Sequence, residues 1–262
     1  MKLLMCIDDT DNLGSPGTGE ILENIGKGIV NNGWGQVSYI TRHQFLIHED
    51  IKYTSHNSSM CFLIETDFED CSGLSHEECR DQITAYGMNY LLENGAEGSD
   101  PGLCITDLEK ISPEETGKLM AFGSRAKKEV LSKEAAYRLA EEIEGVHLSE
   151  HGGTGDGVIG AIAGCGLRLT GNDGKVKGKI KVDDPGKIIT AKELKKRYNA
   201  EAVRAVPNHI EIEDDCMILI GDEIKAVYSH YQMTLPVCVN EDPETSVQAE
   251  WRTCTKKQLK GI

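Results

Sequence analysis

An apolar run that stops abruptly at a group of carboxylates is the feature that most restricts how this chain folds. Residues Lys2–Ile7 are almost entirely apolar, and the segment Asp8–Asp11 (Asp-Asp-Thr-Asp) follows at once. A short apolar run of this kind is typical of a buried strand. A turn rich in glycine, proline and serine comes next, and then a helix with one apolar face from about Thr18 to Asn31. This order of elements predicts a layered α/β or α+β fold.

Helix and strand signals continue along the chain and divide it into two parts. Capping sequences predict further helix starts, at Ser75, Ser112, Ser132 and Thr190. Apolar runs near 37–40 and 60–64 predict strands. After Gly171 short strands and turns dominate, and the first strand, 175–182, alternates lysine with apolar residues. We therefore expect a body with a mixed sheet at residues 1–171 and a smaller, strand-rich α+β domain at residues 172–262.

The composition is that of an ordinary folded protein, and it limits the choice of partners. Hydrophobic residues make up 39% and charged residues 27% of the chain, which excludes disordered and low-complexity proteins. Acidic residues outnumber basic ones by 43 to 28, a net charge of -15. Because most of such a surface repels polyphosphate, RNA binding would need a local basic patch. The densest basic stretch is Lys175–Arg197, which suits either an RNA backbone or a solvated sheet face.

The cysteine pattern and the N-terminal residues favour a cytoplasmic protein that does not bind a membrane. The nine cysteines are scattered, with no C-x-x-C pair, as expected of reduced thiols. The same spacing argues against a structural zinc site, whose sulfur ligands usually come in close pairs. The apolar run at the N-terminus is too short for a signal peptide. The longest weakly polar stretch, 158–167, is about half of the ~20 residues that a membrane helix needs.

Three carboxylates that follow the first strand, those of Asp8, Asp9 and Asp11, are candidate metal ligands. Carboxylates this close repel one another unless a cation lies among them. Oxygen-only ligands favour a hard ion, and Mg²⁺ is usual where phosphates complete its shell. In an extended chain Asp9 and Asp11 would point to one side and Asp8 to the other. The alternative explanation is an acidic turn that caps the following helix.

Thr18 lies where this turn meets the helix, between Gly17 and Gly19. A helix N-terminus offers free backbone donors and the positive end of the helix dipole, and both attract phosphate. We therefore expect Gly17, Gly19 and the nearby Thr10 to bind phosphate. A simple N-cap is the alternative role for Thr18.

A second glycine-rich loop, Gly152–Gly157, precedes a helix of small residues. Residues Gly155–Gly160 match the G-x-G-x-x-G dinucleotide fingerprint. However, the loop starts too far from the preceding strand, and the lysine-rich strand that follows cannot be the buried central strand of that fold. Val158 stands where a Walker A loop requires lysine. The loop is therefore either a helix-packing element or a phosphate site, for which the candidate residues are Gly153, Gly155, Asp156 and Gly157.

Several short segments resemble, in the same order, the archaeal agmatidine synthetase family, which modifies an isoleucine tRNA. The matching segments are Ile7–Asp11 with Thr18 downstream, Tyr53–Asn57, Asp100–Gly102, Ser124–Ala126 and Gly155–Ala161. The resemblance covers about the first 170 residues. It implies an unusual, ATP-dependent kinase-like domain in which Asp8, Asp9 and Asp11 hold Mg²⁺ and the phosphates of ATP. It also implies that Thr18 corresponds to a threonine that can accept phosphate.

Two departures from this family concern the acceptor substrate. The oligonucleotide-binding fold and the cysteine-pair zinc ribbon with which the family grips tRNA are expected to be missing from these residues. Tyr53 and Ser55 stand where the family has basic residues. Together with the net charge, these departures disfavour RNA as the acceptor. His56, Asn57 and His151 are left as candidate contacts to phosphate or substrate, with a structural role as the alternative for the histidines.

These features predict an ATP- and Mg²⁺-dependent phosphotransferase, of kinase or ligase type, that acts on an unidentified small molecule or RNA. Asp9 and Asp11 are the expected metal ligands, and Asp8 is either a third ligand or the base that orients the accepting hydroxyl. One alternative is a nucleotide-binding regulatory module without turnover. The other is a phosphatase with Asp9 as nucleophile, which would form an aspartyl-phosphate without ATP. The sequence is also compatible with a homo-oligomer.

Overall fold

Two compact units, Met1–Thr170 and Gly171–Ile262, make up the chain. The structure is a computed structural model that describes residues 1–51, 56–67, 70–255 and 257–259. Three residues of the segment Tyr53–Asn57, namely Tyr53, Thr54 and Ser55, therefore lie outside the described residues.

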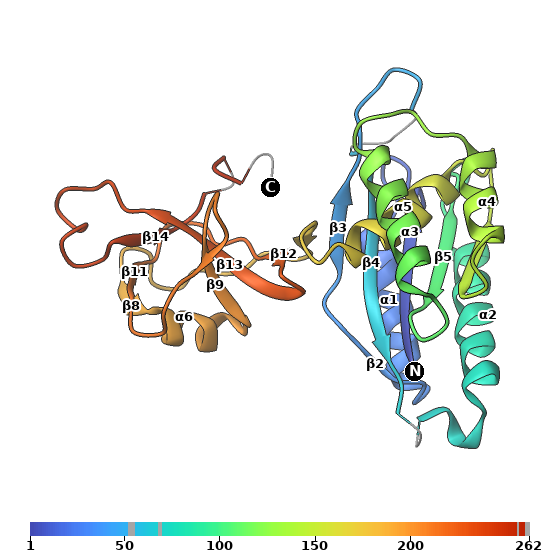
Figure 1. The fold of residues 1–262 in the computed structure, drawn as a ribbon, viewed down its shortest axis with the longest axis horizontal. Helices are drawn as coiled ribbons and strands as arrows, with labels where there is room; N and C mark the ends of the chain where they lie inside the picture. Colours follow the sequence, from blue (N-terminus) through green and yellow to red (C-terminus); the bar gives the residue numbers. More distant parts are fainter. Residues whose placement is uncertain (52–55, 68–69, 256, 260–262) are drawn as a thin grey trace. The chain divides into compact units, whose positions relative to one another are not determined.

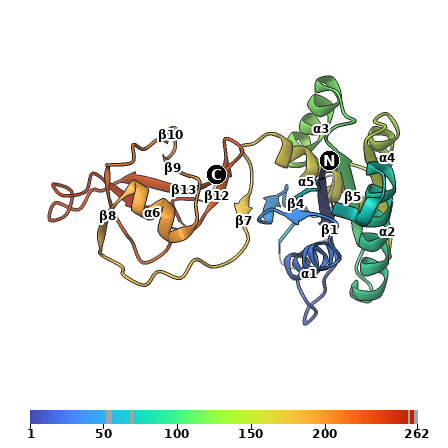
Figure 2. The same ribbon diagram turned by 90° about the horizontal axis from the view of Figure 1, so that it is seen from below.

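The first unit is a sheet with helices on both faces (Figures 1 and 2). Its strands are β1 (Lys2–Asp8), β2 (Gln36–Val37), β3 (Thr41–Gln44), β4 (Ser58–Glu65), β5 (Gly102–Asp107) and β6 (Val146–Glu150). Its helices are α1 (Thr18–Asn31), the 3-10 helix η1 (Asp70–Gly73), α2 (His76–Asn94), α3 (Pro113–Ala126), α4 (Lys133–Glu141) and α5 (Gly157–Leu169). The strand order is β6-β5-β1-β4-β3, with β2 also paired to β4.

The central strand β1 explains why its sequence is apolar throughout. It pairs with β4 on one side and with β5 on the other, and both pairings are antiparallel. Leu3 and Met5 pack in one hydrophobic cluster with α1 and α2, whereas Leu4 and Cys6 pack in a second cluster with α3, α4 and α5. Because alternate side chains of a strand face opposite sides, both faces of β1 are buried. The expected mixed α/β class is confirmed, and the pairs described within this unit are antiparallel, as in α+β folds.

Local capping signals fix the starts of three helices in this unit. Ser75 and Ser112 form capping boxes with Glu78 and Glu115, and Ser132 accepts a hydrogen bond from the backbone of Ala135. Each of these caps satisfies a backbone donor that the helix itself leaves unpaired. These predicted helix starts are confirmed.

The cysteines differ in part from the pattern expected of reduced thiols. Cys71 and Cys79 form a disulfide between η1 and α2. The remaining cysteines are free, and most of them are buried.

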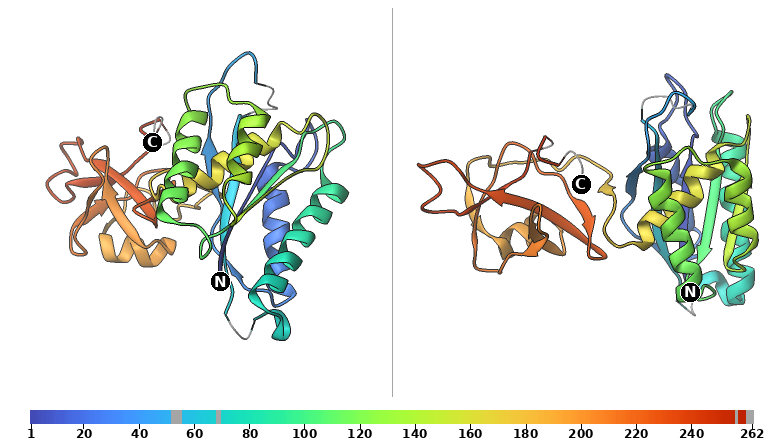
Figure 3. Two further views of the ribbon diagram at one scale, coloured as in Figure 1. Left: turned by 45° about the vertical axis from the view of Figure 1, so that its right-hand side comes forward. Right: turned by 45° about the horizontal axis from the view of Figure 1, so that its top comes forward.

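Small residues let α5 lie close to the sheet and to α3, as Figure 3 shows from two further sides. A Cβ atom added at Gly164 would overlap the side chains of Ser59 and Cys6, and one added at Gly166 would overlap the carbonyl group of Leu119 in α3. The glycines of α5 are thus required by packing, which was one of the two explanations for the small-residue helix.

The second unit is strand-rich, and its sheet contains parallel as well as antiparallel pairs. Its elements are β7 (Lys175–Val176), β8 (Ile188–Thr190), α6 (Ala191–Tyr198), β9 (Ala202–Ala205), β10 (Ile210–Glu211), β11 (Met217–Leu219), β12 (Val227–Ser229), β13 (Gln232–Val239) and β14 (Trp251–Thr253). The parallel pairs are β9 with β13 and β11 with β14. Thr190 forms the predicted capping box with Glu193 at the start of α6.

The prediction of a lysine-rich strand at 175–182 is mostly wrong. Only Lys175–Val176 is a strand, and a single bridge joins Ile180 to Ile224. Gly178 has a φ of +113°, which turns the chain out of the extended conformation. Lys181 pairs with Asp183 at 3.1 Å, so some of the positive charge in this stretch is neutralised locally.

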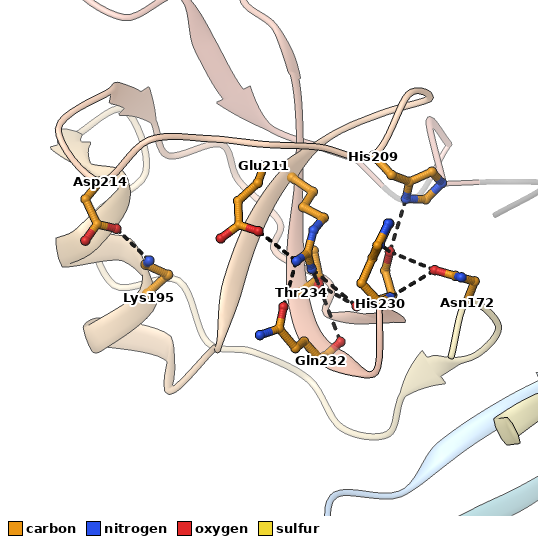
Figure 4. Close-up of polar contacts among 10 residues, drawn as sticks. Asn172, Lys195, His209, Glu211, Asp214, His230, Gln232 and Thr234 are labelled. Carbon is orange, nitrogen blue, oxygen red and sulfur yellow. Dashed lines mark hydrogen bonds and ion pairs between the residues drawn. The ribbon is translucent and has the colours of Figure 1, made fainter. Parts of the chain in front are cut away.

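A buried arginine anchors the hairpin between β12 and β13 in this unit. Three of its hydrogen-bond partners, Glu211, Gln232 and Thr234, are labelled in Figure 4. Arg204, 5% exposed, donates to Thr234 Oγ1 at 2.9 Å, to Glu211 at 2.9 Å and to Gln232 at 2.6 Å. A buried guanidinium is tolerated only when its donors find acceptors, as they do here. The nearby Ser229 hydroxyl contacts Nδ1 of His230 at 3.0 Å.

Among the described residues, no helix combines the length and the apolar character that crossing a membrane requires.

Candidate active site

A cavity of about 340 Å³ lies beside the point where β1 ends. It is lined by the end of β1, the start of α1, the loop that leads into β4, the connection between α3 and α4, and the start of α5. A cavity of this size is within the range of small-molecule sites.

Asp8, Asp9 and Asp11 all line this cavity. The expectation that Asp8 would point away from the other two is wrong, because the strand ends at Asp8 and the next residue leaves the extended conformation. Asp9 has a φ of +49°, in the left-handed region, so the alternation of an extended chain stops there. The backbone N–H of Asp9 donates to Asp8 Oδ1 at 2.9 Å, which fixes the turn.

Thr18 is hydrogen-bonded to Asp11, one of the three carboxylates. Its Oγ1 donates to Asp11 Oδ1 at 2.7 Å, and the residue is buried but lines the cavity. Gly17 is the N-cap of α1, without a side-chain capping bond, so Thr18 does not have the simple N-cap role. The hydroxyl therefore faces the carboxylates at the N-terminus of a helix.

Asp8 lies in the least favourable environment for a charged carboxylate. Removal from water raises its pKa from 3.8 to about 8, and the negative charges of Asp9 and Asp11 add to this effect. The helix α5 contributes to this removal, because a Cβ atom at Gly160 would overlap the Asp8 carboxylate. At neutral pH the Asp8 side chain is therefore mostly protonated, unless a cation stabilises its charged form.

Replacing Asp8 with asparagine should stabilise the protein at alkaline pH. The folded state binds the Asp8 proton up to about pH 8, whereas the unfolded chain releases it near the ordinary value of 3.8. The free energy of unfolding of the wild type therefore falls, relative to Asp8→Asn, as the pH rises from about 4 to 8. At pH 8 we expect the variant to be more stable by about 2–4 kcal/mol. Urea unfolding of both proteins from pH 4 to 9 measures this difference, and parallel stability curves would contradict it.

The second glycine loop, Gly152–Gly157, reaches the same cavity from a distant part of the sequence. Asp156 and Gly157, at the start of α5, line the cavity. Gly153 and Gly155 do not line it, but they shape the loop with φ values of +57° and +79°. Two glycine-flanked helix N-termini, those of α1 and α5, therefore meet at one cavity although about 140 residues separate them.

Asp100 positions this loop from the turn before β5. Its Oδ1 accepts hydrogen bonds from the backbone N–H groups of Thr154 and, at 3.2 Å, of Gly155. The side chain is buried and also lines the cavity. The Asp-Pro-Gly sequence indicated only a turn, apart from the family resemblance, so the role of Asp100 in holding the loop is known from the tertiary structure alone.

Lys133 was missed by the sequence analysis. It is the first residue of α4, and among the described residues that line the cavity it is the one lysine or arginine. Its Nζ donates to Glu150 at 3.0 Å and to the carbonyl oxygen of Thr154 at 2.7 Å. The hydrogen bond to Glu150 raises the pKa of Lys133. No local pattern distinguishes Lys133 from other surface lysines.

The electrostatic character of the cavity is strongly negative. Eight carboxyl-bearing residues line it, namely Asp8, Asp9, Asp11, Asp50, Asp100, Glu129, Glu134 and Asp156. A polyphosphate would be repelled by such a lining unless cations bound with it. The donor atoms of Asp8, Asp9 and Asp11 are oxygen atoms, which suit a hard divalent ion rather than a thiophilic one.

Five large apolar residues also line the cavity, namely Phe45, Ile51, Val130, Leu131 and Ile159. Most of these residues gave no functional signal in the sequence, because apolar side chains in loops are also found in ordinary cores.

Asn57 also lines the cavity, and it joins the two arms of the loop before β4. The side-chain Nδ2 of Asn57 donates to the backbone carbonyl oxygen of Leu46 at 2.6 Å. The backbone carbonyl oxygen of Asn57 accepts from the backbone N–H of Phe45 at 2.9 Å. His56 lines the cavity as well.

Other candidate residues lie near the cavity without lining it. Thr10 is fully buried, and Gly17 and Gly19 flank the start of α1. His151 directly follows β6, the edge strand of this unit's sheet, and its ring contacts Ser149 Oγ at 2.9 Å. The structure thus brings most of the predicted site residues to one cavity, whereas Thr10, Gly17, Gly19 and His151 do not line it.

No protein-family model and no curated protein matches the chain. Similar solved structures include a tRNA fluorescent labeling enzyme, with a TM-score of 0.49 and 24% identity over 63% of this chain and 36% of that chain. Apo TiaS, the agmatidine synthetase of an isoleucine tRNA, has a TM-score of 0.48 and 22% identity over 63% of this chain and 35% of that chain.

A third similar structure is the complex of TiaS with its isoleucine tRNA and ATP, with a TM-score of 0.49, 23% identity, and coverage of 63% of this chain and 36% of that chain. The matched part of the present chain thus spans about a third of the length of these proteins. The solved structures include the tRNA-modifying enzyme whose family the sequence motifs resemble.

Proposed function

We propose that this chain is an ATP- and Mg²⁺-dependent enzyme that transfers a phosphoryl group, as a kinase or as the activating step of a ligase. The observation that carries the proposal is the meeting of three carboxylates and two glycine-flanked helix N-termini at one cavity. Carboxylates hold a divalent cation, and helix N-termini hold phosphate. Few ligands other than a metal–polyphosphate complex require both kinds of group at once.

The carboxylate trio fits Mg²⁺ by the chemistry of its donors. Asp9 and Asp11 offer carboxylate oxygens at the cavity wall, and Asp8 gains most from a cation because burial has raised its pKa. Bound Mg²⁺ would neutralise charge on phosphate oxygens, which is the main requirement of phosphoryl transfer. The acidic lining then has a function, because it makes binding of the phosphates conditional on the cation.

We assign the transfer itself to Thr18 and Asp11. Asp11 Oδ1 already accepts the hydroxyl hydrogen of Thr18, so it can take that proton as Thr18 Oγ1 forms a bond to the γ-phosphorus. The bond between that phosphorus and the β-γ bridging oxygen breaks, and ADP leaves. The resemblance to agmatidine synthetases, in which the matching threonine can accept phosphate, supports this role. The apolar side chains of Phe45 and Val130 would receive the nucleobase.

The acceptor is a small molecule or an RNA, and the charge distribution restricts where an RNA would bind. Residues 171–262 carry 15 lysines and arginines and 15 aspartates and glutamates, so the net charge of -15 belongs to the first 170 residues. An RNA acceptor would therefore contact the second unit rather than the walls of the acidic cavity. We place the reaction in the cytoplasm, where ATP is abundant. The Cys71–Cys79 disulfide is a feature that this location does not by itself explain.

Incubation of the protein with Mg²⁺ and ATP, followed by measurement of its intact mass, tests the proposal. We expect one phosphate to be added to the wild type and ADP to be released. The adduct should be absent in Thr18→Ala, which lacks the accepting hydroxyl, and in Asp9→Ala, which lacks a metal ligand. A Thr18→Ser variant is the matched control, and it should retain the adduct because it keeps the hydroxyl.

The same experiment separates the alternatives. ATP binding without any ADP formation, even with candidate acceptors supplied, would favour a regulatory module. An adduct that forms from a phosphate ester without ATP and is labile to hydroxylamine would favour the aspartate-based phosphatase. A phosphate adduct that Thr18→Ala retains would contradict the role of that threonine but not the use of ATP.

A further inference from the structure

Three cysteines from distant parts of the sequence lie side by side in the first sheet. Cys6 in β1 is the Cα partner of Cys61 in β4 and, on its other side, of Cys104 in β5. Residues paired across antiparallel strands point to the same face of the sheet. All three belong to the hydrophobic cluster beneath α5, and so does Cys165 of α5 itself.

Cys6, Cys61 and Cys165 converge most closely. Their Sγ atoms all lie within 4.8 Å of one another, and each residue is 0% exposed. The glycine next to Cys165 explains the close approach, because a Cβ atom at Gly164 would overlap the Cys6 sulfur. The helix can therefore bring its own thiol down onto the two thiols of the sheet.

The spacing of the three sulfur atoms is close to that of a metal–thiolate centre. With a Zn–S distance of about 2.3 Å, three sulfur ligands around one ion lie about 4 Å apart. The trio would thus need to contract by less than about 1 Å. Sulfur-only donors select thiophilic ions such as Zn²⁺ and reject Mg²⁺, so this site differs in its chemistry from the carboxylate cavity.

Burial keeps the thiols of Cys6, Cys61 and Cys165 in their neutral form unless a cation lies among them, because it raises the pKa of each. Burial raises the pKa of Cys61 to about 12, and the neighbouring His43 opposes this rise. A cation among the sulfur atoms would stabilise the thiolates that burial disfavours. The Cys165 thiol also donates to the backbone carbonyl oxygen of Cys104 at 3.9 Å, so a fourth cysteine lies beside the three.

We propose that Cys6, Cys61 and Cys165 form a buried binding site for a thiophilic divalent ion of the Zn²⁺ type. Each thiol releases its proton to solvent as it binds, so three thiolates and one divalent ion leave a single negative charge. Because the site is enclosed, the ion enters while the chain folds and stays when the folded protein is treated with a chelator. The proposal does not depend on the use of ATP.

Unfolding the whole chain under reducing conditions and refolding it with Co²⁺ tests this site. Refolded wild type should bind about one Co²⁺ per chain and show the sulfur-to-cobalt charge-transfer absorption of a thiolate centre. Protein refolded with Zn²⁺ should keep about one zinc after gel filtration in chelator, as measured by elemental analysis and native mass spectrometry. Its thermal midpoint should exceed that of protein refolded in chelator alone.

Single variants identify the ligands. Cys6→Ala, Cys61→Ala and Cys165→Ala should each lose the charge-transfer band and at least 90% of the retained zinc, an order-of-magnitude expectation for loss of one of three ligands. Cys254→Ala, which removes a buried thiol of the second unit, is the matched control and should keep both. Refolded wild type without retained metal and without the band would overturn the proposal, even if a variant failed to fold. Zinc that is retained equally by the three variants would also overturn it.

Discussion

Replacing Asp9 with asparagine should lower Mg²⁺-dependent ATP turnover by about 100- to 1000-fold, because the substitution removes one full charge from the carboxylate trio. The backbone should not change. Asp9 has a φ of +49°, and asparagine is among the residues that best tolerate this left-handed conformation. The side chain keeps its shape and one oxygen donor, so the effect reports the charge alone. Measurement of ADP release at saturating ATP, with the Mg²⁺ concentration varied, should show a much higher Mg²⁺ requirement for the variant.

Asp50→Asn is the matched control for this prediction. Asp50 lines the same cavity, but its side chain is 72% exposed and lies outside the trio. We expect its loss to change turnover by less than about threefold, as is usual for exposed charges. If Asp9→Asn retained turnover within about twofold of the wild type, Asp9 would not be a metal ligand, and the proposed function would lose its main support.

Replacing Gly157 with alanine should lower the free energy of unfolding by about 3 kcal/mol or more, because the added methyl group meets backbone atoms that cannot move aside. A Cβ atom at this position would overlap the carbonyl oxygen of Asp100 and come within 2.8 Å of the backbone nitrogen of Gly102. The start of α5 would have to move away from β5. Because Gly157 also lines the cavity, we expect ATP affinity to fall at least tenfold, an order-of-magnitude value for a displaced phosphate-binding helix terminus.

Gly117→Ala provides the matched control for backbone effects. Gly117 lies within α3, and a Cβ atom there would meet nothing within 4 Å. Alanine should therefore raise stability by about 0.5–1 kcal/mol through its higher helix propensity. Chemical denaturation measures both variants, and isothermal titration with Mg²⁺ and a non-hydrolysable ATP analogue measures binding. Equal stability of Gly157→Ala and the wild type would show that α5 can shift without cost.

Local interactions explain the parts of the fold that the sequence predicted well. The capping boxes at Ser75 and Ser112 involve residues three positions apart, so they can be recognised in any context. The apolar face of α1 follows directly from helical periodicity. The strand expected at 175–182 failed because a glycine with positive φ interrupts it, and alternation alone does not reveal a backbone break.

The candidate site shows the same division between local and distant information. The sequence predicted Asp8, Asp9 and Asp11 as candidate metal ligands, because neighbouring carboxylates repel one another in any fold. The expectation that Asp8 faces the other way was wrong, because it assumed an extended chain and the left-handed turn at Asp9 interrupts that chain. Lys133 was missed because it reaches the cavity only through the packing of α4 beside the glycine loop.

The amino-acid order alone determined the acidic end of the first strand, the helix starts and the two glycine loops, because each depends on residues within a few positions of one another. Only the tertiary structure decided which of these elements meet. Sheet register aligned Cys6 with Cys61, and the glycines of α5 allowed that helix to approach both the thiols and Asp8. Contacts of this kind join residues more than 50 positions apart, and they arise from strand pairing and helix packing, which no short sequence pattern specifies.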